Sequence, residues 1–369
     1  MVMQTAEQAT DRTVQRVLAT WAPRMIAQGI DYNDFVAATA RIKSWDDWCR
    51  EWSAMGAMHE GLAQEHTRRG ERLSAGEAFF RAAVAYHFAI NNFVHDLEQY
   101  VAGHQKKVAC YQAAAPNLVP PAERHAVPFG SDVRMPAYLR LPPGVTRPPV
   151  VVIISGVDSV KEEHKTMEDG FLARGLATFS FDGPGQGETW FQLGMIVDYE
   201  RATSAVIDYL ASQVPAVDAE RVGVFGPSMG GYLAPRSAAC DPRIKACAVS
   251  GGGYDRLGMR DSVLRGDAFQ TARLHHLFKI ADRQQLLDTL AGCTLEGLAH
   301  NIRCPLLICH GTQDMVPVES AERLYAEASG PKQLLVLEGG NHVNNNMPYR
   351  YRPAVWDFLR LVLLRELGG

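Results

Sequence analysis

The spacing of hydrophobic residues divides the chain into a helical first part and a second part in which strands and helices alternate. From residue 11 to about residue 115, apolar side chains recur every three or four positions, which is the period of an amphipathic α-helix. Prolines between residues 116 and 121 then end the helical pattern. We therefore expect a helical N-terminal domain over residues 1–115 and a second domain over residues 116–369.

Among the helix starts expected in the first domain are a short helix capped by Asp31 or Asn33 and two starts with a capping box. Ser44 with Asp47, and Ser74 with Glu77, have the spacing of a capping box at a helix N-terminus. Three tryptophans on the helix expected after Ser44 are more typical of a packed core than of a binding site. A lone helical bundle would nevertheless leave much apolar surface exposed, so we expect part of this domain to cover the second domain as a cap.

The second domain is expected to have an α/β fold with a mostly parallel sheet. Almost continuous apolar runs alternate with helix-compatible stretches from residue 123 onward, which is typical of a parallel sheet covered by helices on both faces. Residues 252–300 have helical character without a clear strand, and we expect them to form a small lid above the strand ends. The expected strands are 125–129, 135–141, 150–154, 176–181, 222–225, 244–249, 306–309 and 333–337, and the expected helices are 199–213, 229–239, 319–329 and 352–367.

Composition and charge narrow the class of protein. Of 369 residues, 47% are hydrophobic and 21% are charged, as in an ordinary globular protein. The formal net charge is −4, from 37 basic and 41 acidic side chains, and the chain has no long basic run. These values argue against nucleic acid or an anionic membrane surface as a partner.

Further features indicate a cytoplasmic protein. The N-terminal segment lacks the basic and apolar regions of a secretory signal, and no apolar stretch approaches the length of a membrane span. Seven cysteines are scattered without the spacing of a metal or redox site. We expect reduced, mostly buried thiols, with no metal and no cofactor.

The strongest chemical signal is the sequence Gly-Pro-Ser-Met-Gly at residues 226–230. It follows an apolar strand and precedes a predicted helix, as expected of a nucleophile elbow. Glycines on both sides of Ser228 allow a turn so sharp that the serine oxygen stands clear of the backbone. Ser228 is the candidate nucleophile, and the alternative is a structural turn that happens to contain a serine.

An acid and a base that could activate the serine follow later in the chain. Asp314 and His342 lie just beyond the last two expected strands. Because the carboxyl ends of parallel strands meet at one edge of a sheet, we expect both side chains beside Ser228. The alternatives are a plain turn aspartate, with Glu338 as a competing acid, and a histidine in a surface loop.

Two backbone amides would stabilise the oxyanion that forms when a serine attacks a carbonyl. Met229 directly follows the nucleophile, and Val157 lies in the loop after the strand 150–154. That loop continues with a run of charged residues. We expect Glu162 and Glu163 in this run to be exposed to solvent.

Three side chains are candidate substrate contacts, namely Asp158, Trp190 and Tyr254. Trp190 follows the sequence Asp-Gly-Pro-Gly-Gln-Gly at residues 182–187. This glycine-rich turn lacks the spacing and the lysine of a phosphate-binding loop, which argues against a nucleotide. We interpret the turn as a rigid part of the pocket wall.

These motifs together resemble the serine α/β-hydrolases. A closer resemblance rests on the helical N-terminal domain and on the segments SGVDSVKEE, FDGPGQGE and GPSMGG. This set is similar to the group of 2,6-dihydroxypseudooxynicotine hydrolase and the fungal hydrolases that shorten polyketides. The resemblance implies hydrolysis of a carbon–carbon bond next to an aryl ketone or within a β-dicarbonyl compound, with a triad of Ser228, Asp314 and His342. It also implies an additional carboxylate after the strand 244–249, where this chain has no matching glutamate.

Carbon–carbon bond hydrolysis is thus the leading functional hypothesis. Carboxylester hydrolysis by the same residues is the alternative, because the two reactions differ in how the leaving group is protonated. A catalytically silent binding module is a third class, against which the intact serine, acid and histidine argue. We expect a small-molecule substrate, and the candidate assembly is a homodimer.

Overall fold

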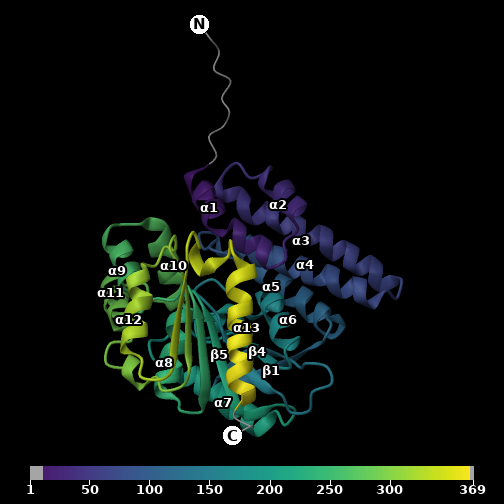
Figure 1. Cartoon of the computed structure of the whole chain (residues 1–369). Coiled ribbons are helices and arrows are strands. Elements are labelled where there is room, and N and C mark those ends of the chain that lie inside the picture. Colours follow the sequence, from purple (N-terminus) through teal and green to yellow (C-terminus); the bar gives the residue numbers. More distant parts are fainter. Residues whose placement is uncertain (1–10, 366–369) are drawn as a thin grey trace. The chain divides into compact units, whose positions relative to one another are not determined.

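The computed structural model describes residues 11–365, and the chain divides into two compact units, residues 1–119 and 120–369 (Figure 1). The first unit extends beyond the expected boundary because a short 3₁₀ turn, Ala115–Asn117, continues its last helix. The expectation about a secretory signal, and the last two residues of the expected closing helix, lie outside the described residues. No helix in the described range is both long and apolar enough to cross a membrane.

The described part of the first unit is helical, as expected. Helix α3 packs against α4, and α4 packs against α5. Gly103 allows the close approach of α5 to α4, since a Cβ at this position would lie 2.5 Å from Cγ2 of Ile90. The helices are α1 (Arg12–Ala27), α2 (Tyr32–Thr39), α3 (Trp45–Arg68), α4 (Arg72–Ile90) and α5 (Leu97–Ala114).

Two tryptophans of α3 belong to the core of this unit, and the third, Trp45, is half-buried beside them. Trp48 and Trp52 are fully buried, and Nε1 of Trp48 donates a hydrogen bond to the carbonyl of Phe88 on α4 at 2.8 Å. The ring of Trp45 lies 5.1 Å from that of Trp48. This packing agrees with the core interpretation of the three tryptophans.

One of the two expected starts with a capping box is observed. Oδ2 of Asp47 accepts a hydrogen bond from the N–H of Ser44 at 2.9 Å, and α3 begins at the next residue. The start expected at Ser74 is wrong, because α4 already begins at Arg72. Gly70, with a φ of +74°, ends α3 in the left-handed conformation, and the next helix follows at once.

The second unit is built on one eight-stranded sheet with the order β1-β2-β4-β3-β5-β6-β7-β8. Strand β2 runs antiparallel to both of its neighbours, and every other pair is parallel. All eight expected strands are present, so the prediction of a mostly parallel sheet is confirmed. The strands are β1 (Ala122–Phe129), β2 (Val133–Arg140), β3 (Pro149–Ile154), β4 (Ala177–Phe181), β5 (Asp218–Pro227), β6 (Ile244–Ser250), β7 (Leu306–Gly311) and β8 (Lys332–Leu337).

Helices cover both faces of this sheet. On β3, Val150, Val152 and Ile154 belong to one hydrophobic core, whereas Val151 and Ile153 belong to a second. The first core is completed by α7 (Glu200–Gln213), α8 (Gly230–Cys240) and α12 (Val318–Glu327), and the second by α6 (Lys165–Leu172) and α13 (Pro348–Arg365). Figure 1 shows α13 lying along its face of the sheet.

The segment between β6 and β7 forms the expected helical insertion. Helix α9 packs against both α10 and α11, and an isolated bridge pairs Asp255 with Thr294. A role of this insertion as a lid stays a prediction. The helices are α9 (Leu257–Leu264), α10 (Ala268–Phe278) and α11 (Arg283–Gly292).

Candidate active site

Ser228 lies in a sharp turn between β5 and α8. Its φ is +58°, in the left-handed region that L residues rarely occupy. A Cβ at Gly226 would collide with the carbonyl oxygen of Gly230, and a Cβ at Gly230 would collide with that of Ile154. Both flanking glycines are therefore required for this turn, as the elbow motif predicts.

Ser228, His342 and Asp314 form one chain of hydrogen bonds. Nε2 of His342 lies 2.8 Å from Oγ of Ser228, and its Nδ1 lies 2.6 Å from Oδ1 of Asp314. The side chains of Asp314 and His342 are 0% and 5% exposed. A carboxylate beside Nδ1 favours the tautomer that carries its proton there, which leaves Nε2 free to accept the serine proton.

Two backbone amides hold the Asp314 carboxylate in place. The N–H of Val316 donates to Oδ1 at 2.9 Å, and the N–H of Val343 donates to Oδ2 at 3.1 Å. The competing acid, Glu338, follows β8 and is exposed. The geometry thus favours Asp314 over Glu338 as the partner of His342.

The loop that carries His342 is strained. Val343 and Asn344 have φ values of +62° and +56°, and such positions cost on the order of 1–3 kcal/mol each. The hydroxyl of Ser250, at the end of β6, donates to the carbonyl of Val343 at 3.0 Å. Strain of this kind persists when surrounding contacts fix the backbone, so the position of His342 is set from β6 as well as from β8.

The two expected oxyanion donors belong to two segments that lie next to the nucleophile. Met229 directly precedes α8, and the loop after β3 passes so close that a Cβ at Gly156 would lie 3.2 Å from Cβ of Ser228. Within the described chain, neither the Met229 amide nor the Val157 amide donates to a protein acceptor. Both amides are therefore available to an oxyanion.

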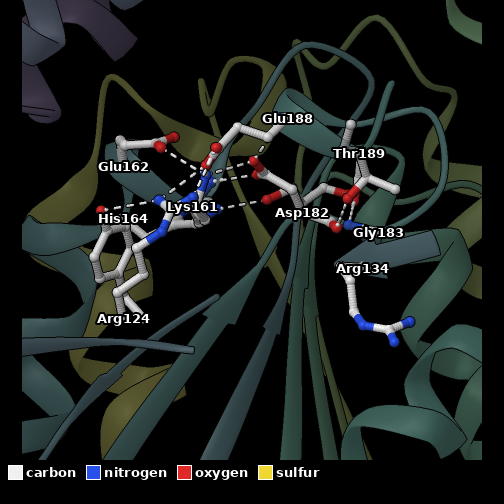
Figure 2. Close-up of polar contacts among 12 residues, drawn as sticks. Arg124, Arg134, Lys161, Glu162, His164, Asp182, Gly183, Glu188 and Thr189 are labelled. Atoms are coloured by element: carbon white, nitrogen blue, oxygen red, sulfur yellow. Dashed lines mark hydrogen bonds and ion pairs between the residues drawn. The ribbon is translucent and has the colours of Figure 1, made fainter. Parts of the chain in front are cut away.

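A buried ion cluster lies beside this loop (Figure 2). Nζ of Lys161 is 2.6 Å from Glu162, 2.7 Å from Asp182 and 2.7 Å from Glu188. Burial alone would lower the pKa of Lys161, but the three carboxylates raise it well above its usual value. The expectation of solvated glutamates is wrong, because Glu162 and Glu163 are both buried.

The same carboxylates have the spacing of a metal site, which the sequence did not reveal. Glu162, Asp182 and Glu188 each bring one oxygen within 4.8 Å of the others. The Lys161 ammonium already lies among these oxygens and neutralises part of their charge. The cluster is therefore built around a lysine rather than a metal ion.

Two of the three candidate substrate contacts, Asp158 and Trp190, contact the same helix, α10. Asp158 pairs with Arg273 of α10 at 3.3 Å. Nε1 of Trp190 donates to the carbonyl of His276 at 2.6 Å, and the two rings stack with centroids 4.0 Å apart. Both residues thus contact the helical insertion.

The side chain of Tyr254 contacts a different element, helix α12. It is 1% exposed, and its hydroxyl donates to Glu327 of α12 at 2.5 Å. The guanidinium of Arg323 lies 3.9 Å from the centroid of its ring. These contacts give Tyr254 a packing role against α12.

Two family models match the chain. Residues 26–263 match the FrsA-like esterases, and residues 185–363 match the prolyl oligopeptidase family. The first match spans more than half of the chain.

Individual relatives extend this similarity. The chain is 36% identical over 355 residues to the 2,6-dihydropseudooxynicotine hydrolase of Paenarthrobacter nicotinovorans, a match that covers 92% of this chain and 91% of that protein. It is 34% identical over 245 residues to 20-hydroxy-prefusarin hydrolase FUS2 of Gibberella moniliformis, which covers 62% of this chain and 58% of that protein. The crystal structure of 2,6-dihydroxy-pseudo-oxynicotine hydrolase matches with a TM-score of 0.85 and 34% identity, over 94% of this chain and 96% of that one. The resemblance and the fold class inferred from the sequence are thereby confirmed.

Proposed function

The chain belongs to the FrsA-like esterase family of α/β-hydrolases, and on this premise we propose that it is a serine hydrolase with Ser228, His342 and Asp314 as its catalytic triad. The observation that carries the proposal is the continuous hydrogen-bond chain through these three side chains. The strained turn at Ser228 supports it, because strain of this kind gathers at functional sites.

The reaction follows from the roles that these groups can take. Oγ of Ser228, or a water that Ser228 orients, attacks the carbonyl carbon while Nε2 of His342 accepts the proton. The amides of Val157 and Met229 stabilise the negative charge on the carbonyl oxygen. When the intermediate collapses, the leaving group takes the bonding electron pair and receives the proton from His342. Where Ser228 is the attacking group, a water then hydrolyses the acyl-serine, with His342 again as the base.

We further propose that the bond broken is a carbon–carbon bond next to a ketone, in an aryl ketone or a β-dicarbonyl compound. The support is the full-length similarity to an enzyme named 2,6-dihydropseudooxynicotine hydrolase, together with the three sequence segments on which the resemblance rests. In this reaction the leaving group is a carbanion, so its protonation by His342 is essential.

Ester hydrolysis is the second candidate, and the match to a family model described as an esterase favours it. The test is a panel of aryl esters and aryl β-diketones with matched acyl groups, with products identified by mass spectrometry and Ser228→Ala as the blank. Cleavage of the diketones into an acid and a ketone supports the carbon–carbon proposal. Turnover of the esters alone would establish the ester alternative.

We propose that the enzyme acts in the cytoplasm, on a small-molecule substrate. The support is that all seven cysteines are free, which suits a reducing compartment. The helical first unit is proposed to act as a cap, and a homodimer stays the candidate assembly. Sedimentation of the purified protein measures the assembly directly.

A further inference from the structure

The side chain of Gln186 holds the loop that carries one of the two oxyanion donors. Gln186 lies in the glycine-rich turn after β4 and is 1% exposed. Its Nε2 donates to the carbonyl oxygen of Ser155 at 2.7 Å and to that of Gly156 at 3.2 Å. The amide nitrogen of Gln186 thus donates to two successive peptide carbonyls.

The other end of the amide is fixed as well. Oε1 of Gln186 accepts hydrogen bonds from the hydroxyl of Tyr199 at 2.7 Å and from the N–H of Gly183 at 3.1 Å. A flipped amide would place Oε1 against two carbonyl oxygens and the NH₂ group against an N–H donor. The four partners thus allow one orientation of the side chain.

The turn itself is anchored through Asp182 (Figure 2). Oδ1 of Asp182 accepts from the N–H of Lys161 at 3.0 Å, and Oδ2 accepts from Nζ of Lys161 at 2.7 Å and from the N–H of Glu188 at 2.9 Å. A Cβ at Gly187 would collide with the same carboxylate. The loop after β3 is therefore tied to the loop after β4 at two places, by Asp182 and by Gln186.

These contacts determine where the Val157 amide points. The carbonyl of Gly156 and the N–H of Val157 belong to one planar trans peptide, so the two groups point in opposite directions. By holding the Gly156 oxygen, Gln186 turns the Val157 N–H away from itself. Gly156 itself lies beside Ser228.

We propose that Gln186 is a positioning residue of the oxyanion hole, which aims the Val157 amide by holding the peptide before it. The inference rests on the proposed function, because it requires Ser228 to attack a carbonyl or an equivalent centre. The buried pair of Lys161 and Asp182 holds in place the turn that carries Gln186. In this scheme Gln186, Lys161 and Asp182 do not contact the substrate.

The test compares Gln186→Met, which keeps the length of the side chain but removes its donors, with the parent protein. The matched control is Gln192→Met, because the amide of Gln192 also contacts backbone atoms, those of Arg134, but at the exposed surface. The first readout is the rate at which a fluorophosphonate labels Ser228, measured at several probe concentrations to give the probe affinity and the maximal labelling rate. The second is kcat and KM for p-nitrophenyl butyrate. Thermal unfolding of each variant checks its fold.

Loss of one oxyanion donor costs about 100- to 1000-fold in kcat, so misaligning it in Gln186→Met should lower the maximal labelling rate and kcat by about 10- to 100-fold. KM should stay within about threefold, because a misaimed donor weakens the transition state more than the bound substrate. Tyr199→Phe, which removes one anchor of Gln186, should give a smaller loss in the same direction. Gln192→Met should behave as the parent.

Two results would overturn the inference. One is a folded Gln186→Met variant with parental maximal rates, and the other is a loss confined to KM. If Gln186→Met does not fold, the same criteria apply to Tyr199→Phe. A parent protein that is not labelled at Ser228 contradicts the proposed function itself, so the two failures are distinguishable.

Discussion

Nε2 of His342 lies 2.8 Å from Oγ of Ser228, although 114 positions separate the two residues in the chain. The parallel strands β5 and β8 bring them together, because both end at the same edge of the sheet. Asp314, beyond the end of β7, holds the other ring nitrogen at 2.6 Å. The carboxylate beside Nδ1 favours the tautomer with its proton on that nitrogen, so Nε2 can accept the hydroxyl proton of Ser228, as a general base at a serine requires.

Replacing Asp314 by asparagine should keep the shape of the site but favour the wrong tautomer of His342. We expect kcat to fall roughly ten-thousandfold, while KM changes little. Steady-state kinetics with an activated ester measure the effect. The matched control is Glu338→Gln, which changes an exposed acid four positions before His342 in the chain and should leave kcat unchanged. A loss of kcat in Glu338→Gln but not in Asp314→Asn would show that Glu338 is the acid.

The candidate triad could be inferred from sequence because each member follows a strand of a parallel sheet, so the order of elements predicts their convergence. The buried cluster could not be inferred in this way. Glu162 and Glu163 belong to a run of charged residues, which is normally solvated. Glu162 is buried with Lys161, which pairs with it and with Asp182 and Glu188 from a different loop. Helix α6 was also not expected, since its eight residues are too few to show a helical period.

Lys161 should be essential for stability. Lys161→Met leaves three carboxylates without their common cation, and breaking a buried ion pair costs about 3–5 kcal/mol in the free energy of unfolding. The matched control is Lys165→Met, which breaks the ion pair between Lys165 and Asp169. The Lys165 side chain is 22% exposed and that of Asp169 is 40% exposed. Exposed pairs contribute at most about 1 kcal/mol. Urea unfolding of both variants measures how much each change lowers the free energy of unfolding. Equal decreases would contradict a buried cluster.

The contribution of Glu188 should depend on pH. Burial alone would raise the pKa of Glu188, but Lys161 and Arg124 together lower it below its ordinary value of 4.5. A carboxyl with a lowered pKa stabilises the fold above its unfolded-state pKa and loses this effect as the pH falls through its folded-state pKa.

Glu188→Gln should therefore be less stable than the parent at neutral pH by about 1–3 kcal/mol. The gap should begin to narrow as the pH falls below the ordinary pKa of 4.5, and it should close as the pH falls through the lowered pKa of Glu188 in the folded protein, where the parent glutamate also becomes neutral. Urea unfolding across this pH range measures the difference. A gap that stays constant with pH would show that Glu188 is not ionised in the folded protein.

The proposed cap can be tested by truncation. A protein that begins at Pro120 keeps Ser228, Asp314, His342 and the whole sheet. If the helical unit covers the active site, this shortened protein should be insoluble, or its soluble fraction should not cleave the proposed ketone substrate. That soluble fraction should still hydrolyse p-nitrophenyl butyrate. Closure would matter because water competes for a leaving carbanion. Turnover of the full-size substrate at the parental rate would exclude a cap role.

The most direct test of the account is to identify the residue that a fluorophosphonate modifies. Mass spectrometry of the digested, labelled protein should find a single adduct, on the peptide that contains Ser228. Ser228→Ala should lose both the adduct and the activity, by a factor on the order of a million in kcat, while its thermal unfolding stays parental. An unlabelled Ser228, or a Ser228→Ala variant that keeps more than about a hundredth of the parental activity, would contradict the assignment of Ser228 as the nucleophile.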